Sequence, residues 1–169
     1  RSGLLTEALL YSDWVSDDYM IFEDGRVVSR KTFDEVYKLD LSHIAYMDGA
    51  LCLSGSFVAV QTDEETVKVY DLSKGKEVHS INLSCLSFAQ TKMMLSADGR
   101  YLVYCHGDDV FSAYDLSTGE KLRDMNDPDI RYCRLADSAR YAFDVVYEDA
   151  HSGWVSLYSL DNPDKDMIM

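Results

Sequence analysis

The 169-residue sequence is short of several kinds of residue, and each shortage excludes a class of protein. Only 16 Lys and Arg stand against 30 Asp and Glu, so the net charge is −14, and a nucleic-acid partner, which requires clustered basic residues, is not expected. No apolar run approaches the ~20 residues that a membrane-spanning helix needs, so we expect no membrane partner. With only 2 Pro and 9 Gly, no low-complexity stretch marks a linker. Because 47% of the residues are hydrophobic, we expect one folded domain or part of one.

Metal-binding and catalytic motifs are also missing. The four cysteines form no CxxC pair, so we interpret them as reduced core thiols of an intracellular, cytoplasmic protein. Of the four histidines, only His106 and His151 fall in equivalent turns, and solvated turn residues are the simpler interpretation. Neither a Gly-x-Ser-x-Gly elbow nor a Gly-rich phosphate loop occurs. The sequence therefore predicts no catalytic residue, no metal site and no cofactor.

What the sequence does contain is an internal repeat. The segment Tyr70–Gly75 (YDLSKG) recurs 44 residues later as Tyr114–Gly119 (YDLSTG), and after another 44 residues Tyr158–Asp161 (YSLD) takes the same place. A second marker is a turn followed by an aromatic residue and alternating apolar residues. Its leading aromatic residues are Tyr19, Phe57, Tyr101 and Tyr141. Together the markers define four units with a period of 38 to 44 residues.

Within each unit the hydrophobic pattern has the period of a β-strand. Val58 and Val60 alternate with small or polar residues, as do Val67 and Val69, whereas a helix requires a period of 3.6. Each unit accommodates four short strands, and a four-stranded antiparallel unit every ~40–45 residues is typical of a β-propeller blade. The predicted fold is an all-β propeller segment of about four blades, each a four-stranded antiparallel sheet, at residues 8–41, 47–83, 90–126 and 129–169.

The repeat also predicts structural roles. The leading aromatic residues are expected to lie on second strands and to pack between neighbouring sheets. Asp71 and Asp115 end third strands, so we expect their carboxylates to accept hydrogen bonds from backbone N–H groups of the following turn.

The run from Ser96 to Val103 (SADGRYLV), followed by Tyr114–Glu120 (YDLSTGE), resembles the WD40 and YVTN-type propeller families. Those families commonly show Ser-Pro-Asp-Gly before the second strand and Trp-Asp-Leu-x-x-Gly after the third. Here Tyr replaces the Trp, and the Gly-His dipeptide is missing from every unit. The repeats are also similar to those of NACHT–WD signalling proteins. The resemblance implies a non-enzymatic protein-interaction scaffold within a larger intracellular protein.

Four blades alone would leave a problem at the two ends of the arc. Closed propellers have 4 to 8 blades, and no cysteine lies in the first or last 30 residues to tie a small ring together. An open arc would leave two exposed strand edges, which invite aggregation. We therefore expect the chain to be about half of a 7- or 8-bladed ring, with the remaining propeller blades in the same full-length chain.

An enzyme is the alternative interpretation. The segment Asp71–Val78 also resembles the Asp-x-x-Thr-Gly-Lys turn of quinoprotein propellers, which would imply a fragment of a quinone-dependent enzyme. Those repeats normally carry a Trp in the fourth strand, and the corresponding stretches Val78–Ile81 and Leu122–Met125 contain none. Uptake of pyrroloquinoline quinone with calcium would favour the enzyme.

One loop of each unit carries the candidate binding site. The turns between second and third strands contain nine carboxylates and no Lys or Arg: Glu23, Asp24, Asp63, Glu64, Glu65, Asp108, Asp109, Glu148 and Asp149. Because these turns project from one face of a propeller, we predict an acidic arc that recruits a basic segment of a protein partner by electrostatic steering.

The turns on the other face have the opposite charge. Those between third and fourth strands carry Lys31, Lys74, Lys76, Lys121 and Lys165. The sequence therefore predicts a module that is electrically polarised from one face to the other.

Overall fold

The computed structural model describes residues 14–42, 50–63, 65–83, 92–105, 110–126, 134–135, 141–147 and 153–168. These residues form four antiparallel sheets of four strands each, and within each sheet the strands follow one another in chain order. Apart from the 3-10 helix η3 (Pro163–Lys165), the regular elements within those ranges are all strands. The period-2 pattern of the sequence thus produced the all-β architecture that it predicts.

The four sheets are numbered along the chain. The first consists of β1 (Trp14–Val15), β2 (Tyr19–Ile21), β3 (Arg26–Ser29) and β4 (Glu35–Lys38). The second consists of β5 (Leu51–Ser54), β6 (Phe57–Gln61), β7 (Thr66–Asp71) and β8 (Lys76–Asn82). The third consists of β9 (Lys92–Leu95), β10 (Tyr101–Cys105), β11 (Val110–Asp115) and β12 (Glu120–Asn126). The fourth consists of β13 (Arg134–Leu135), β14 (Tyr141–Tyr147), β15 (Gly153–Ser159) and β16 (Met167–Ile168).

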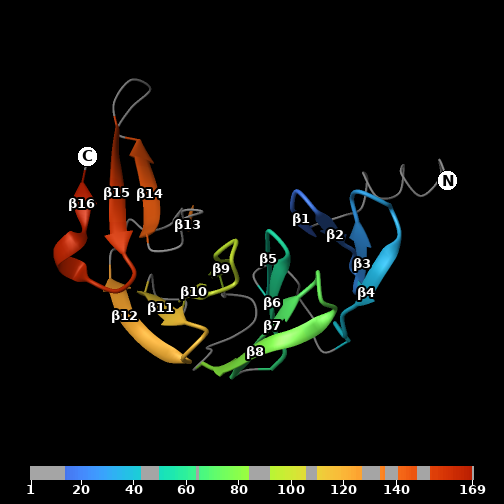
Figure 1. Cartoon of the computed structure of the whole chain (residues 1–169). Helices are drawn as coiled ribbons and strands as arrows, with labels where there is room; N and C mark the ends of the chain where they lie inside the picture. The colour runs from blue at the N-terminus through green and yellow to red at the C-terminus, as the bar shows by residue number, and fades with distance from the viewer. Residues whose placement is uncertain are drawn as a thin grey trace.

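The sheets stand side by side in an arc that is open on one side (Figure 1). Their first strands lie innermost, because β1 contacts β5, β5 contacts β9 and β9 contacts β13. The fourth strands β8 and β12 lie on the outer side of the arc (Figure 1). Radial sheets with their first strands around a common axis are the architecture of a propeller, so the predicted four-blade segment is confirmed.

The core consists of apolar layers between neighbouring sheets. In the second sheet, Val58 and Val60 pack against the first sheet, whereas Ala59, Val67 and Val69 pack against the third. All five are at most 1% exposed, so both faces of this sheet are buried. Burying a Val side chain stabilises the fold by about 1.5–3 kcal/mol. The second sheet therefore depends on both of its neighbours for its stability.

The predicted aromatic residues begin the second strands β2, β6, β10 and β14. Phe57 of the second sheet lies directly against Gly99, in the turn between β9 and β10 of the third sheet. A Cβ on Gly99 would come within 2.5 Å of the Phe57 ring, and its φ is +72°, so only glycine fits there. This contact confirms that the aromatic residue of one unit packs against its neighbour.

The aspartates that end third strands close the following turns, as predicted. Asp71 Oδ1 accepts the N–H of Ser73 at 3.0 Å, and Asp115 Oδ1 accepts the N–H of Ser117 at 2.9 Å. Asp115 Oδ2 also accepts a hydrogen bond from Arg100 Nη2 at 2.9 Å. Burial pushes the pKa of Asp115 up, but the bonds from Ser117 and Arg100 outweigh it and hold the pKa below its ordinary value. These carboxylates are structural.

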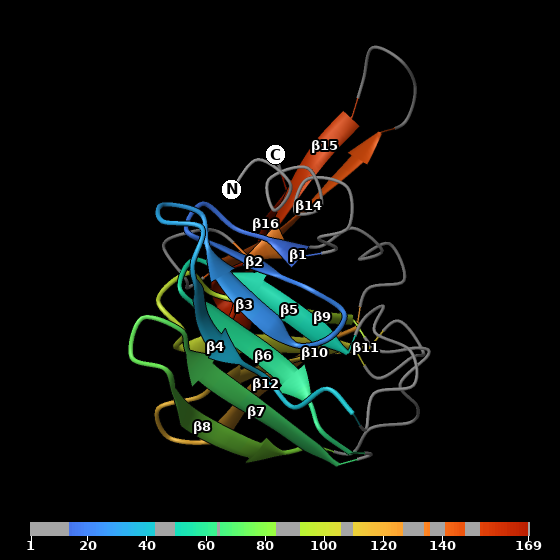
Figure 2. The same cartoon turned by 90° about the vertical axis from the view of Figure 1, so that its right-hand side faces the viewer.

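Antiparallel strands place successive turns on opposite faces of the arc. In Figure 2 the β2–β3 and β6–β7 turns lie on the right, and the β3–β4 and β7–β8 turns lie on the left. The connection that leaves each fourth strand begins on the same side as the turn between second and third strands. We call this side the acidic face, after the turns at residues 22–25 and 62–65, and the other side the opposite face.

Candidate functional site

Two of the four predicted acidic turns lie within the described residues. Glu23 and Asp24 lie in the β2–β3 turn, and Asp63 and Glu65 lie in the β6–β7 turn, both on the acidic face (Figure 2). The other five predicted site residues lie outside the described residues: Glu64, Asp108, Asp109, Glu148 and Asp149. The acidic arc as a whole therefore stays a prediction.

Each described acidic turn is held by the chain that leaves the fourth strand of the same sheet. The N–H of Leu39 donates to the carbonyl oxygen of Gly25 at 2.8 Å, and the N–H of Leu83 donates to that of Glu65 at 2.5 Å. Both leucines are 3% exposed, so their side chains anchor the connection in the core beneath the turn. Gly25 has a φ of +84°, and a Cβ there would lie 2.1 Å from the Leu39 carbonyl oxygen. The same backbone hydrogen bond thus joins each of the two acidic turns to the chain that leaves the fourth strand of its sheet.

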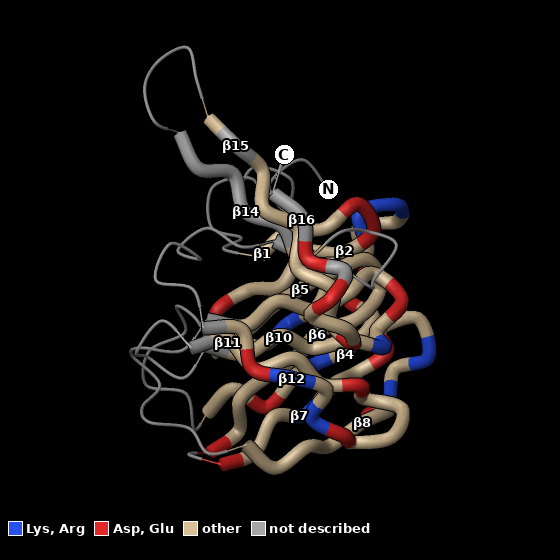
Figure 3. The backbone as a smooth tube through the Cα atoms, turned by 90° about the vertical axis from the view of Figure 1, so that its left-hand side faces the viewer, with Lys and Arg blue, Asp and Glu red and all other residues tan. Residues whose placement is uncertain are grey.

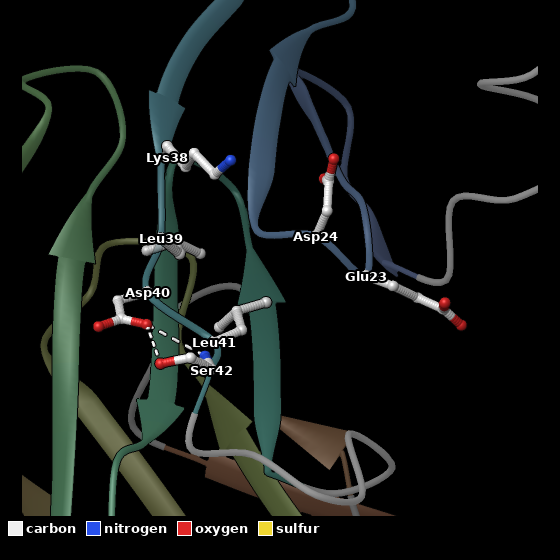
Figure 4. Close-up of a pocket in the computed structure, with 7 residues that line it drawn as sticks. All are labelled: Glu23, Asp24, Lys38, Leu39, Asp40, Leu41 and Ser42. Carbon is white, nitrogen blue, oxygen red and sulfur yellow. Dashed lines mark hydrogen bonds between the residues drawn. The ribbon is translucent and has the colours of Figure 1, made fainter.

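A cleft of about 430 Å³ opens between the β2–β3 turn and the chain that follows β4 (Figure 4). In Figure 4 the Lys38 ammonium and the Asp24 carboxylate lie on facing sides of this space, while Glu23 points away from it. Asp40 accepts hydrogen bonds from the backbone N–H and the hydroxyl of Ser42. The lining residues are Glu23, Asp24, Lys38, Leu39, Asp40, Leu41 and Ser42.

The part of this cleft at the end of β4 and in the chain after it was not predicted from the sequence. Lys38 ends β4, and Asp40 and Ser42 belong to the connection toward the second sheet, whereas only the turns between second and third strands were compared. The sequence could have predicted this part of the cleft, because in an antiparallel four-stranded unit the connection after the fourth strand begins on the same face as the turn between the second and third strands. Asp40 adds a carboxylate to the acidic face, and Lys38 adds a cation.

The two acidic turns differ in how far their charge is compensated. Arg26 Nε lies 2.6 Å from Asp24 Oδ2, so Asp24 already has a cationic partner. Burial pushes the pKa of Asp24 up, but the hydrogen bonds and charge of Arg26 outweigh it and lower the pKa. A hydrogen bond from the N–H of Glu65 lowers the pKa of Asp63, so this carboxylate is charged at neutral pH. The second sheet therefore offers the less compensated negative charge.

The lysines of the opposite face are largely paired. Lys31 lies 2.7 Å from Asp18, Lys74 lies 2.6 Å from Asp71, and Lys121 lies 2.7 Å from Asp124. In Figure 3 the blue segments lie in the middle and on the right of the view, whereas red segments reach both sides. The positive charge of the opposite face is therefore smaller than the sequence predicted, because these three lysines have carboxylate partners.

Within the described ranges, no three or more His, Cys, Asp and Glu side chains converge as metal ligands would. Burial raises the pKa of the Cys52 thiol to about 11, so this thiol stays protonated at neutral pH. Among those same residues, no helix is both long and apolar enough to cross a bilayer.

No protein-family model matches this sequence, and no curated protein matches it in sequence. Several solved structures are similar in shape. Hsv2 of Kluyveromyces lactis is 11% identical with a TM-score of 0.56, and the match covers 88% of this chain and 48% of Hsv2. The computationally designed protein Ika8 is 16% identical with a TM-score of 0.53, over 91% of this chain and 47% of Ika8.

A third similar structure is the WD40 domain of coronin from Toxoplasma gondii, which is 12% identical over 94% of this chain and 46% of that domain. Its TM-score of 0.49 is too low to carry an argument. The likenesses to Hsv2 and Ika8 show a shared fold alone, because their identities are far below 25%. This chain spans about half the length of the structures that it resembles.

Proposed function

We propose that this chain, a segment with the WD40-type β-propeller fold, is a non-enzymatic protein-interaction scaffold within a larger cytoplasmic protein. The supporting observation is that the turns of two successive sheets present Glu23, Asp24, Asp63 and Glu65 on one face. The remaining blades of the ring lie in the same full-length chain, which agrees with a match to about half of each similar structure.

The partner is a basic segment of another protein. A row of carboxylates on one face raises the local concentration of cations and accelerates encounter, with an association rate that falls as salt screens the charges. Single exposed ion pairs contribute only about 0–1 kcal/mol each, so the recruitment is collective. Because Arg26 already neutralises Asp24, the arc depends most on the turns of the later sheets.

The test is the association rate of a fluorescein-labelled oligolysine peptide, measured by stopped-flow anisotropy over a range of NaCl concentrations, with the full-length protein. In the arc variant, five carboxylates are reversed to Lys: Asp63, Glu64, Glu65, Asp108 and Asp109. In the matched control variant, five exposed carboxylates of the opposite face are reversed: Asp17, Asp34, Glu35, Glu120 and Asp164. Both variants carry the same net charge, so they differ only in where the charge lies.

The proposal predicts that the arc variant loses most of the association rate and of its salt dependence, whereas the control variant retains much more of both. Equal losses in the two variants would mean that oligolysine responds only to net charge, and the acidic arc would then be a solvated rim. An oligoglutamate peptide of the same length should not associate with the unmodified protein.

A further inference from the structure

The hairpin formed by β14 and β15 is longer than its counterparts in the first two sheets. The pairing of β2 with β3 ends at Ile21, and that of β6 with β7 ends at Gln61, two and four residues after the aromatic residue that begins the second strand. The pairing of β14 with β15 continues to Tyr147, six residues after Tyr141. Each further residue pair lengthens a hairpin by about 3.4 Å. The hairpin accordingly projects beyond the other three sheets (Figure 2).

The core identifies one face of this hairpin. Ala142 and Tyr158 pair with each other and pack in the apolar layer between the third and fourth sheets. Because successive residues of a strand lie on opposite faces of the sheet, every second residue shares the face of these two. Toward the end of the hairpin, the next positions on that face are Asp144 and then Val146, which pairs with Trp154.

Asp144 occupies a position that is apolar and buried in two other sheets. It is the third residue after the aromatic residue that begins its strand, as are Val60 in β6 and Tyr104 in β10. Both of those residues are 1% exposed. A carboxylate is costly at a position of this kind unless a cation compensates it. The packing of the layer between sheets therefore does not explain why this residue is an aspartate.

The next pair outward on the same face supplies an aromatic residue. Trp154 is the diagonal neighbour of Asp144 across the two strands, because Asp144 pairs with Ser156. Diagonal neighbours are about 7–8 Å apart, within reach of one long side chain. The Trp ring attracts a cation over its face more strongly than the other aromatic rings, and a carboxylate binds the same cation by its charge. The hairpin thus places two cation-binding groups together.

We propose that Asp144 and Trp154 form a subsite for one Lys or Arg side chain of the basic partner segment. The subsite rests on the proposed function in taking a basic segment as the partner. It adds a short-range contact to the long-range steering of the acidic arc. Steering determines how fast the segment arrives, whereas a contact with a desolvated head group determines how long it stays.

The test is the dissociation rate of the fluorescein-labelled oligolysine peptide from the full-length protein, measured by stopped-flow displacement with excess unlabelled peptide. Trp154→Leu keeps an apolar side chain but removes the ring, and Trp154→Tyr is the conservative variant that keeps a ring. Asp144→Asn removes the carboxylate charge. Glu120→Gln, at an exposed position of the opposite face, removes one charge as the matched control.

Trp154→Leu and Asp144→Asn should each raise the dissociation rate by about 2- to 30-fold, the range expected for a cation over an aromatic ring. Trp154→Tyr should raise it less than Trp154→Leu does, and Glu120→Gln should leave it nearly unchanged. Because both groups hold the same cation, the double variant of Asp144 and Trp154 should raise the rate by less than the product of the two single effects.

Unchanged dissociation in both Trp154→Leu and Asp144→Asn would overturn the subsite. Equal effects of Trp154→Tyr and Trp154→Leu would also overturn it, because the ring would then matter only for the packing of the hairpin. A double variant whose effect equals the product would overturn the shared cation.

The association rate separates this subsite from the proposed function. If the arc variant retains its association rate while Trp154→Leu still speeds dissociation, the acidic arc fails and the subsite stands. If the arc variant loses its association rate while Trp154→Leu and Asp144→Asn dissociate as slowly as the unmodified protein, the subsite fails and the arc stands.

Discussion

Two glycines with nearly the same backbone conformation give a prediction that separates strain from steric conflict. Gly25, in the acidic β2–β3 turn, has a φ of +84°, and Gly119, in the β11–β12 turn, has a φ of +74°. A Cβ on Gly25 would lie 2.1 Å from the Leu39 carbonyl oxygen, whereas a Cβ on Gly119 would meet no atom within 4 Å. Substitution by Ala therefore adds the same strain at both positions but a clash at only one.

The expected magnitudes follow from these contacts. A non-glycine residue in the left-handed region costs about 1–2 kcal/mol, which is the whole expected loss of unfolding free energy for Gly119→Ala. Gly25→Ala adds overpacking of roughly 1–3 kcal/mol, because backbone must move. It also weakens the hydrogen bond from Leu39 to Gly25, which contributes about 0.5–1.5 kcal/mol. The expected loss for Gly25→Ala is therefore about 2.5–6.5 kcal/mol.

The assay is urea denaturation of both variants and of the unmodified full-length protein, followed by far-ultraviolet circular dichroism. The unfolding free energies of the two variants should differ by at least about 1.5 kcal/mol, since only Gly25→Ala clashes and weakens a hydrogen bond. Equal losses would refute the reasoning, because they would mean that the chain after β4 does not lie against the acidic turn.

Three further predictions concern the core, the aspartates and a thiol. Leu102→Ala should lower the unfolding free energy by about 2–5 kcal/mol, since Leu102 is 0% exposed, and half-buried Leu122→Ala should cost less in the same titration. Folding lowers the pKa of Asp71 and of Asp115. Their contribution to the free energy of unfolding is therefore fully present above the ordinary pKa of 3.8, and it is lost as pH falls through the lower pKa values of the folded protein. Acid titrations should therefore show a shallower loss of stability below pH 3.8 for the Asp71→Asn, Asp115→Asn double variant than for the unmodified protein. The Cys52 thiol should react with maleimide only after urea unfolds the protein, since burial raises its pKa to about 11, and fast labelling of the native protein would contradict this.

The fold was predictable where the information is local. The hydrogen bonds that Asp71 and Asp115 accept depend on residues only two positions away in the following turn, and the structure confirmed them. The structure also confirmed that the aromatic residues predicted from the local pattern begin the second strands. The repeat supplied the rest, because a strand pattern that recurs four times determines the order of the sheets. Strand alternation then determines which side chains enter each layer between sheets.

Features that depend on pairs distant in the sequence were not predictable in the same way. Lys31 and Asp18 form an ion pair only because β2 and β3 lie side by side, and this pair weakens the predicted polarity. Arg123 binds Asp166, 43 residues away, across the third and fourth sheets at 2.9 Å. The left-handed conformation of Phe33 has no local signal, because propensity favours glycine there.

A hydrogen-exchange footprint of the oligolysine peptide on the full-length protein tests most directly whether the acidic face is the interaction surface. If it is, exchange should be slower in the four turns between second and third strands, at residues 22–25, 62–65, 106–109 and 148–152. Exchange in the turns of the opposite face, at residues 30–34, 73–75 and 117–119, should not change. Slowed exchange in the turns of the opposite face, or an unchanged rate in all seven segments at saturating peptide, would contradict the claim that the acidic face is the interaction surface.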